Sequence, residues 1–205
     1  MAGDRVERRL AAVLAADVVG YSLLMGADEV GTLAALKTLR REIVDPAIAE
    51  HRGRIVKTTG DGLLIEFGSA VDAVTCAMAV QAQVADGAHN RTPSIVFRIG
   101  INIGDIIIDG DDIFGDGVNV AARVENECEP GGVCLSASAF EQVRGKTEFT
   151  FRDLGERSLK NIERPVRLYG VRTVGDAANA ANAPTVSPSP QQRGSELHPV
   201  PKTPS

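Results

Sequence analysis

This sequence is poor in cysteine and aromatic residues and has no excess of basic ones, and each shortage excludes a class of protein. It has three cysteines without CxxC spacing and no tryptophan among 205 residues. Three thiols so arranged do not form a disulfide framework, so we expect a reduced, cytoplasmic setting. The net charge of −5 offers no basic surface for nucleic acid or anionic lipid. A polyanionic ligand such as a nucleotide would need bound metal and a few local cations.

Long apolar runs are also missing. No stretch approaches the length that crosses a bilayer, and the charged N-terminus MAGDRVERRL lacks the apolar core of a signal peptide. The contents of 43% apolar and 24% charged residues are those of a soluble globular protein, and the length suits one domain.

The composition changes near residue 174. Residues 174–205 hold six of the ten prolines and no aromatic residue, so this segment cannot bury enough apolar surface to offset the entropy of ordering it. We therefore predict an N-terminal extension over residues 1–9, one folded domain over residues 10–173, and a disordered, Pro/Ala/Ser-rich tail over residues 174–205.

Strand and helix patterns alternate through the folded domain. Residues 95–103 alternate cleanly between apolar and polar side chains, which predicts a half-buried strand that turns at Gly104-Asp105. The other predicted strands are residues 10–16, 55–59, 63–67, 106–108, 133–135, 149–154 and 166–171. The predicted helices are residues 28–44 with Asp28 as N-cap, a shorter piece after Asp45-Pro46, a second helix from about 71, and residues 117–128. The order β-α-β-β-α-β predicts an α+β, ferredoxin-like sheet with helices on one face.

Two aspartates follow or join predicted strands. Asp17 ends an apolar strand, and Asp61 lies at the tip of a Gly-Asp-Gly hairpin. Carboxylates at adjacent strand ends can bind hard cations, and Mg²⁺ on a nucleotide needs one or two such ligands. Aspartate is also common in turns, so these two residues alone favour an ordinary turn and a strand-end charge.

Three further patterns are weak by themselves. The turn at Val18–Ser22 contains a glycine whose neighbouring amides can cradle phosphate, or it is an ordinary strand–helix loop. Asn119 and Arg123 are one helical turn apart, so they can hold a sugar and a phosphate or form a solvated face. Lys57 and Asp112 offer a donor and an acceptor that match the N1 and N6 positions of adenine.

Together these motifs resemble the catalytic domain of class III nucleotidyl cyclases over roughly residues 10–172. The segment LAADVVGYS is similar to the opening motif of that family, and VKTTGDGLLIEF to its Lys-Thr-x-Gly-Asp hairpin. DIFGDGVNVAAR resembles its Asp-x-x-Gly-x-x-Val-Asn-x-x-x-Arg segment, and LKNIERPVRLYGV its closing strands. Several motifs in one order are far more specific than any one of them.

The resemblance implies an adenylate cyclase that converts ATP into cyclic AMP and pyrophosphate. It implies that Asp17 and Asp61, with the carbonyl of Val18, hold two Mg²⁺ or Mn²⁺ ions. The other implied roles are phosphate contact for Val19, Gly20, Tyr21 and Ser22, purine selection for Lys57 and Asp112, ribose orientation for Asn119, transition-state charge stabilisation for Arg123, and triphosphate binding for Lys160.

The resemblance also implies an assembly, because active sites of this family form between two domains. This chain carries both sets of residues, so we expect a head-to-tail homodimer with two equivalent sites. Relatives are commonly joined to sensor, membrane or repeat domains, so we expect a separate regulatory partner or a regulatory domain outside this chain. The alternatives are a guanylate cyclase and a catalytically silent nucleotide-binding or dimerisation module.

Overall fold

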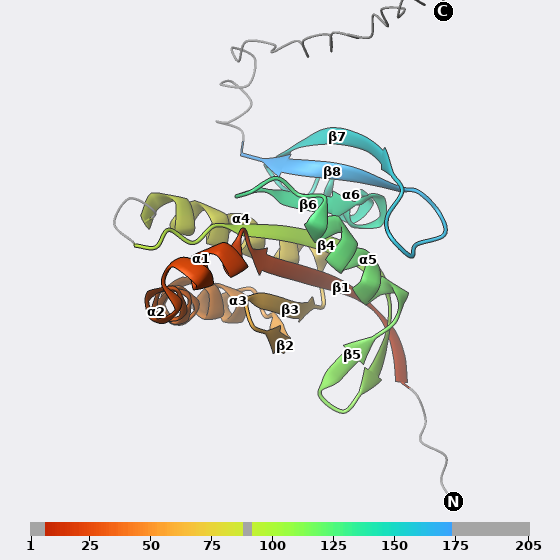
Figure 1. The fold of residues 1–205 in the computed structure, drawn as a ribbon. Coiled ribbons are helices and arrows are strands. Elements are labelled where there is room, and N and C mark those ends of the chain that lie inside the picture. Colours follow the sequence, from red (N-terminus) through yellow and green to blue (C-terminus); the bar gives the residue numbers. More distant parts are fainter. Residues whose placement is uncertain (1–6, 88–91, 174–205) are drawn as a thin grey trace, which may run out of the picture.

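The computed structural model describes residues 7–87 and 92–173, which form one sheet with helices packed against it (Figure 1). The strands are β1 (Glu7–Val18), β2 (Arg54–Thr59), β3 (Gly62–Phe67), β4 (Phe97–Asp109), β5 (Asp112–Phe114), β6 (Val133–Ser136), β7 (Thr150–Arg157) and β8 (Val166–Arg172). The helices are α1 (Tyr21–Ala27), α2 (Glu29–Leu39), α3 (Asp45–Glu50), α4 (Ala70–Gly87), α5 (Asp116–Asn126) and α6 (Ala137–Val143), with a π-helical turn η1 (Arg40–Val44) between α2 and α3.

The sheet has the strand order β2-β3-β1-β4-β6-β8-β7, and β5 pairs with β4 beside this path. Its first four strands are antiparallel, with β1 between β3 and β4. This is the ferredoxin-like order of a β-α-β-β-α-β unit, so the predicted α+β fold is confirmed. β6 then adds in parallel to β4, and the β7–β8 hairpin extends the sheet.

Strand β1 is buried on both faces, and this overturns the expectation that all helices cover one face. Alternate residues of a strand point to opposite faces. Ala12, Leu14 and Ala16 pack in the same core cluster as residues of α2, α3 and α4. Ala11, Val13 and Ala15 pack on the opposite side with residues such as Ala121 of α5. The one-face arrangement holds for the β-α-β-β-α-β unit, while α5, which follows it, covers the second face.

Strand β4 does not turn at Gly104-Asp105, contrary to the prediction. It pairs with β1 without interruption from Phe97↔Val18 to Ile108↔Glu7. A Cβ on Gly104 would lie 2.9 Å from the Cα of Gly117, at the start of α5. The glycine therefore permits a close helix–strand approach, which a sequence pattern does not distinguish from a turn.

The first helical segment covers nearly the predicted span, but it contains a π-helical turn, η1, that was not predicted. Asp28 caps α2 as expected, because its side chain accepts a hydrogen bond from the backbone N–H of Gly31 at 2.9 Å. Asp45-Pro46 starts the shorter helix α3 as predicted, and Pro46 lies in the first turn of α3, where a missing N–H costs little. Helices α1 and α6 and strand β5 were not predicted.

None of the described helices has the length and apolarity to cross a membrane.

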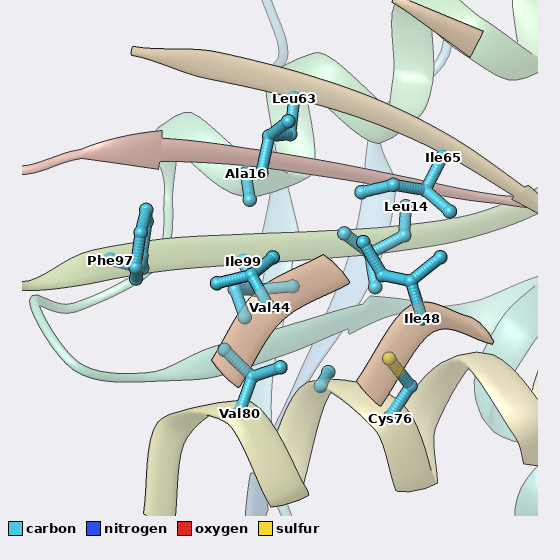
Figure 2. A pocket seen from close by; sticks show the side chains of 11 residues that line it. Leu14, Ala16, Val44, Ile48, Leu63, Ile65, Cys76, Val80, Phe97 and Ile99 are labelled. Carbon is cyan, nitrogen blue, oxygen red and sulfur yellow. The ribbon is translucent and has the colours of Figure 1, made fainter. Parts of the chain in front are cut away.

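The main core between the sheet and α4 is closely packed and apolar. It encloses a cavity of about 20 Å³. Figure 2 shows the side chains around this cavity, which come from β1, β3 and β4 on one side and from η1, α3 and α4 on the other. Burial raises the pKa of the Cys76 thiol in its wall to about 12, so this cysteine acts as a small apolar side chain. The cavity is therefore part of the core rather than a binding site.

The chain ends are described only in part. Residues 7–9, assigned above to the extension, belong to β1 and pair with Ile106–Ile108 of β4. The disordered tail predicted for residues 174–205 lies outside the described residues.

Candidate active site

A surface cavity of about 370 Å³ lies where β1 ends, beside the β2–β3 hairpin and α5. Three of the predicted site residues line it, namely Asp17, Lys57 and Asp61. Its remaining wall comes mainly from small and apolar side chains and from Glu125 of α5. The structure thus brings both predicted metal-binding aspartates to one cavity.

The β2–β3 hairpin places Asp61 next to the end of β1. Gly60 has φ +64°, a left-handed conformation that suits glycine in a tight turn. Ala16 pairs with Leu63 across β1 and β3, so the turn residues just before Leu63 lie beside Asp17. The glycines thus fix where the Asp61 carboxylate is presented.

Asp17 is held from the neighbouring strand by Arg98, a residue without a predicted role. The guanidinium donates from Nε to Oδ1 at 3.1 Å and from Nη2 to Oδ2 at 2.6 Å. The contact with Asp17 raises the pKa of Arg98 above its ordinary value. A bidentate pair of this kind fixes the carboxylate orientation as well as its charge. The only sign of this role in the sequence is that Arg98 lies on the polar side of the alternating segment at residues 95–103.

Glu125 is the second functional candidate that sequence reasoning missed. It is 7% exposed, and its Oε1 has no hydrogen-bond partner among the described residues although Arg98 Nε lies 3.5 Å away. Burial, followed by the neighbouring Asp17 carboxylate, raises the pKa of Glu125 to about 8. Glu125 lies two residues after Arg123, outside the matching motif positions.

The donor set suits a hard divalent cation. Asp17 and Asp61 supply carboxylate oxygens, and Val18 directly follows Asp17 at the end of β1. Within residues 7–87 and 92–173, no three His, Cys, Asp or Glu side chains gather as a metal site. Mg²⁺ commonly takes only one or two protein carboxylates and completes its shell with water and substrate phosphates. The two aspartates therefore fit ions that a nucleotide helps to bind.

Lys57 and Asp112 form a direct ion pair. Lys57 Nζ lies 2.6 Å from Asp112 Oδ2, and the other oxygen of Asp112 accepts a hydrogen bond from Ile113 N–H at 2.9 Å. The contacts with Lys57 and the Ile113 amide lower the pKa of Asp112. Lys57 comes from β2 and Asp112 from β5, so two segments distant in sequence present one donor and one acceptor side by side.

Asn119 and Arg123 lie on α5 as predicted, but they do not line the cavity. Val118 and Ala122 line it, and each is followed by one of these two residues. Successive residues of an α-helix are rotated by about 100°, so Asn119 and Arg123 project from a different side of α5 than the residues that line the cavity. Arg123 donates from Nε to the backbone carbonyl of Lys160 at 3.1 Å, which brings these two predicted residues together.

The predicted phosphate turn leads directly into α1. Val18 is the last residue of β1, and the Val19 N–H donates to the Val96 carbonyl at 2.8 Å. Gly20 has φ +68° and precedes α1, so Tyr21 and Ser22 form the first turn of the helix rather than a loop. Their contact with phosphate stays a prediction.

The sequence matches one protein family over most of its length. Residues 7–173 match the family described as "Adenylate and Guanylate cyclase catalytic domain". A protein from Rhizobium meliloti named "Putative adenylate cyclase 3" is 50% identical over 172 residues, which are 82% of this chain and 29% of that protein. The chain thus spans less than a third of this relative.

Solved structures with the same fold also carry cyclase names. An adenylate/guanylate cyclase/hydrolase from Silicibacter pomeroyi has a TM-score of 0.76 at 47% identity, covering 81% of this chain and 98% of that one. The adenylyl cyclase CyaB from P. aeruginosa has a TM-score of 0.73 at 25% identity, covering 82% and 96%.

Proposed function

The chain belongs to the adenylate and guanylate cyclase catalytic domain family, and from that premise we propose that it is an adenylate cyclase acting as a homodimer. The reaction is the attack of the ribose 3′-oxygen on the α-phosphorus of ATP, which forms 3′,5′-cyclic AMP and expels pyrophosphate. Positioning and electrostatic stabilisation supply most of such a rate enhancement.

The choice of ATP over GTP rests on the Lys57–Asp112 pair. Adenine presents an acceptor at N1 and a donor at its N6 amino group, so it matches one cation and one carboxylate. Guanine reverses this pattern at the same edge. The ion pair of 2.6 Å supports adenine, because the ammonium and the carboxylate already lie side by side. Each of them can exchange its present partner for a hydrogen bond to the base.

The metal sites are assigned to Asp17 and Asp61, with the carbonyl of Val18 as an additional ligand. Two bound Mg²⁺ or Mn²⁺ ions would lower the pKa of the ribose 3′-hydroxyl and neutralise the triphosphate. Arg98 holds Asp17 from the side of β4, which keeps the carboxylate oriented when no ion is present.

The homodimer is proposed because the two sets of residues face different ways on one chain. Asp17 and Asp61 line the cavity, whereas Asn119 and Arg123 project from another face of α5. A second copy placed head to tail would supply Asn119 for the ribose and Arg123 for the charge at the α-phosphate. Arg123 and Lys160 then approach the phosphates together, as their contact at 3.1 Å allows.

Two alternatives are distinguishable by experiment. A guanylate cyclase would use the same Asp17 and Asp61 with GTP. A silent nucleotide-binding or dimerisation module would bind nucleotide without releasing pyrophosphate. The presence of both aspartates and of Arg123 favours a working enzyme over the silent module.

The test is to incubate purified protein with ATP or GTP and Mn²⁺ and to separate the products by chromatography. We expect cyclic AMP from ATP, and we expect Asp61→Ala to lose it while remaining a folded dimer. Cyclic GMP as the main product would refute the assignment of Lys57 and Asp112. No product from either nucleotide would favour the silent module.

A further inference from the structure

The residue that reads the base, Asp112, lies on a hairpin that projects from the sheet. β5 has three residues and pairs only with β4 among the described strands, and Figure 1 shows it at the end of the sheet, away from α2, α3 and α4. Gly110 has φ +58° in the turn between β4 and β5. A two-stranded ribbon is marginally stable by itself, so the position of Asp112 depends on what else holds this turn.

One arginine of β2 contacts the turn directly. Arg54 donates from Nη1 to the backbone carbonyl of Asp111 at 2.9 Å. Asp111 directly precedes Asp112, and the backbone of Asp112 pairs with Asp109 across the hairpin. A bond to the Asp111 carbonyl therefore restrains the backbone that carries the base-reading carboxylate.

Arg54 is itself oriented by a buried carboxylate. Its Nε and Nη2 atoms donate to Glu66 Oε2 at 3.1 and 2.8 Å. Glu66 is 5% exposed, and its other oxygen, Oε1, pairs with Arg9 of β1. A buried carboxylate is costly unless it is paired, so the guanidinium of Arg54 is held with its remaining nitrogen toward Asp111.

An irregularity in β2 lets two of its residues reach the same hairpin. Arg54 and Lys57 are three apart, and an ordinary strand would send them to opposite faces. The pairing of β2 with β3 shifts register between Ile55 and Lys57, which marks a β-bulge at Val56. Both cations therefore contact neighbouring residues of the turn, Arg54 the carbonyl of Asp111 and Lys57 the carboxylate of Asp112.

We propose that Arg54, oriented by Glu66, is a positioning residue for base selection. Arg54 touches no substrate in this proposal. It fixes the β4–β5 turn so that Asp112 stays beside Lys57 at the spacing that adenine requires. The proposal rests on the proposed function for its consequence in selectivity, while its structural part concerns the hairpin alone.

The test compares Arg54→Leu, Arg54→Lys and Glu66→Gln with wild type and with Arg167→Leu. Arg167 forms an exposed ion pair with Asp153 at 2.7 Å on β7 and β8, so its variant controls for the loss of an arginine–carboxylate pair elsewhere in the sheet. Thermal unfolding of each variant serves to establish that it is folded.

The first readout is the ratio of kcat/KM for ATP to that for GTP. Arg54→Leu is expected to lower it by about tenfold, the effect of one displaced hydrogen-bonding group, mainly through a higher KM for ATP. Glu66→Gln is expected to act in the same direction. The ratio for Arg54→Lys should lie between that of Arg54→Leu and that of wild type, because one ammonium cannot bind both Glu66 and Asp111 with the same geometry. An unchanged ratio in a folded Arg54→Leu protein would overturn the role in selection.

The second readout is hydrogen exchange of peptides covering residues 105–115, which needs no turnover. Faster exchange there in Arg54→Leu, with unchanged exchange in Arg167→Leu, is expected. If wild type makes neither cyclic nucleotide, the proposed function fails, and this readout still decides the structural part. Unchanged protection of the hairpin in Arg54→Leu would refute the proposal.

Discussion

Arg98 spans both oxygens of Asp17, at 2.6 and 3.1 Å, and its Nε also lies 3.5 Å from Glu125. One guanidinium therefore lies beside two carboxyl groups, which repel each other once both are ionised. The side chains of Arg98 and Asp17 are each about one quarter exposed, so solvent screens this pair only in part. The arrangement orients Asp17, and it makes Arg98 the counter-charge that keeps Glu125 beside it.

Replacing Arg98 with leucine should destabilise the protein by about 2 kcal/mol, less than for a fully buried pair because of partial exposure. At a pH above about 8, where Glu125 is ionised, Glu125→Gln in the same chain should restore part of this loss, because it removes the repulsion with Asp17. Urea unfolding of the single and double variants in EDTA measures the coupling. Arg41→Leu, which removes an exposed pair with Glu42, serves as the control. Strictly additive effects would contradict the shared counter-charge.

The raised pKa of Glu125, about 8, predicts a pH-dependent stability in metal-free buffer. The unfolded chain loses this proton near the ordinary pKa of glutamate, while the folded chain keeps it up to about 8. The stabilising contribution is thus complete below the unfolded pKa and is lost as pH rises toward and through about 8. Urea unfolding from pH 5 to 9 in EDTA should show this decline in wild type and less of it in Glu125→Gln. Parallel curves for the two proteins would contradict the assignment.

Elements of the fold were predictable where a local sequence pattern specified them. Residues of the candidate site were predictable only where they belong to a family motif. The alternation in residues 95–103 and the glycine-flanked turn at Asp61 located β4 and the β2–β3 hairpin correctly. The predicted turn at Gly104 was wrong because glycine occurs both in turns and where a helix packs closely on a strand. The sequence also gave no sign that α5 covers a second sheet face, since that depends on long-range packing.

The supporting residues of the site were missed for a related reason. Arg98, Glu125 and Arg54 act through partners 81, 27 and 57 residues away, respectively. Polar residues with distant partners look like ordinary surface charge until the strand register is known. Motif matching located the residues assigned to substrate and metal, whereas the register of β1, β2 and β4 showed what holds them.

Gly100 permits the close approach of α5 to β4, which predicts a large effect of one methyl group. A Cβ on Gly100 would overlap the backbone nitrogen of Glu125 and lie 2.7 Å from the carbonyl oxygen of Ala121. Gly100→Ala should therefore cost about 3 kcal/mol, at the upper end for overpacking, since backbone cannot give way easily. Thermal and urea unfolding measure the loss. Gly68→Ala is the matched control, because nothing lies within 4 Å of its added Cβ. Equal stabilities of the two variants would refute the packing argument.

Arg123 is expected to act on charge that develops only in the transition state. Arg123→Ala should then lower kcat by about 100-fold or more and raise the KM for ATP far less. Steady-state rates with Mn²⁺ give both constants. Arg157→Ala, which removes an exposed arginine with a distant contact to Glu127 at 3.8 Å, should change neither much. Unchanged turnover in Arg123→Ala would remove this residue from the mechanism.

Asn119 and Arg123 do not line the cavity that holds Asp17 and Asp61, and with the proposed homodimer this predicts complementation between inactive proteins. In the proposed homodimer, Asp61→Ala would lack a metal ligand and Arg123→Ala would lack the charge for the α-phosphate, so each homodimer would have two defective sites. In a mixed dimer both defects fall in one site, and the other combines an intact Asp61 with an intact Arg123. Differently tagged variants, co-purified as heterodimers, should therefore recover up to half of the wild-type activity per dimer. A mixture of Asp61→Ala with Asp17→Ala is the control, because both defects lie on the same side and every site stays impaired. No recovery in the first heterodimer would show that each active site is completed within one chain. Recovery in the control would show that Asp17 and Asp61 of one site come from different chains.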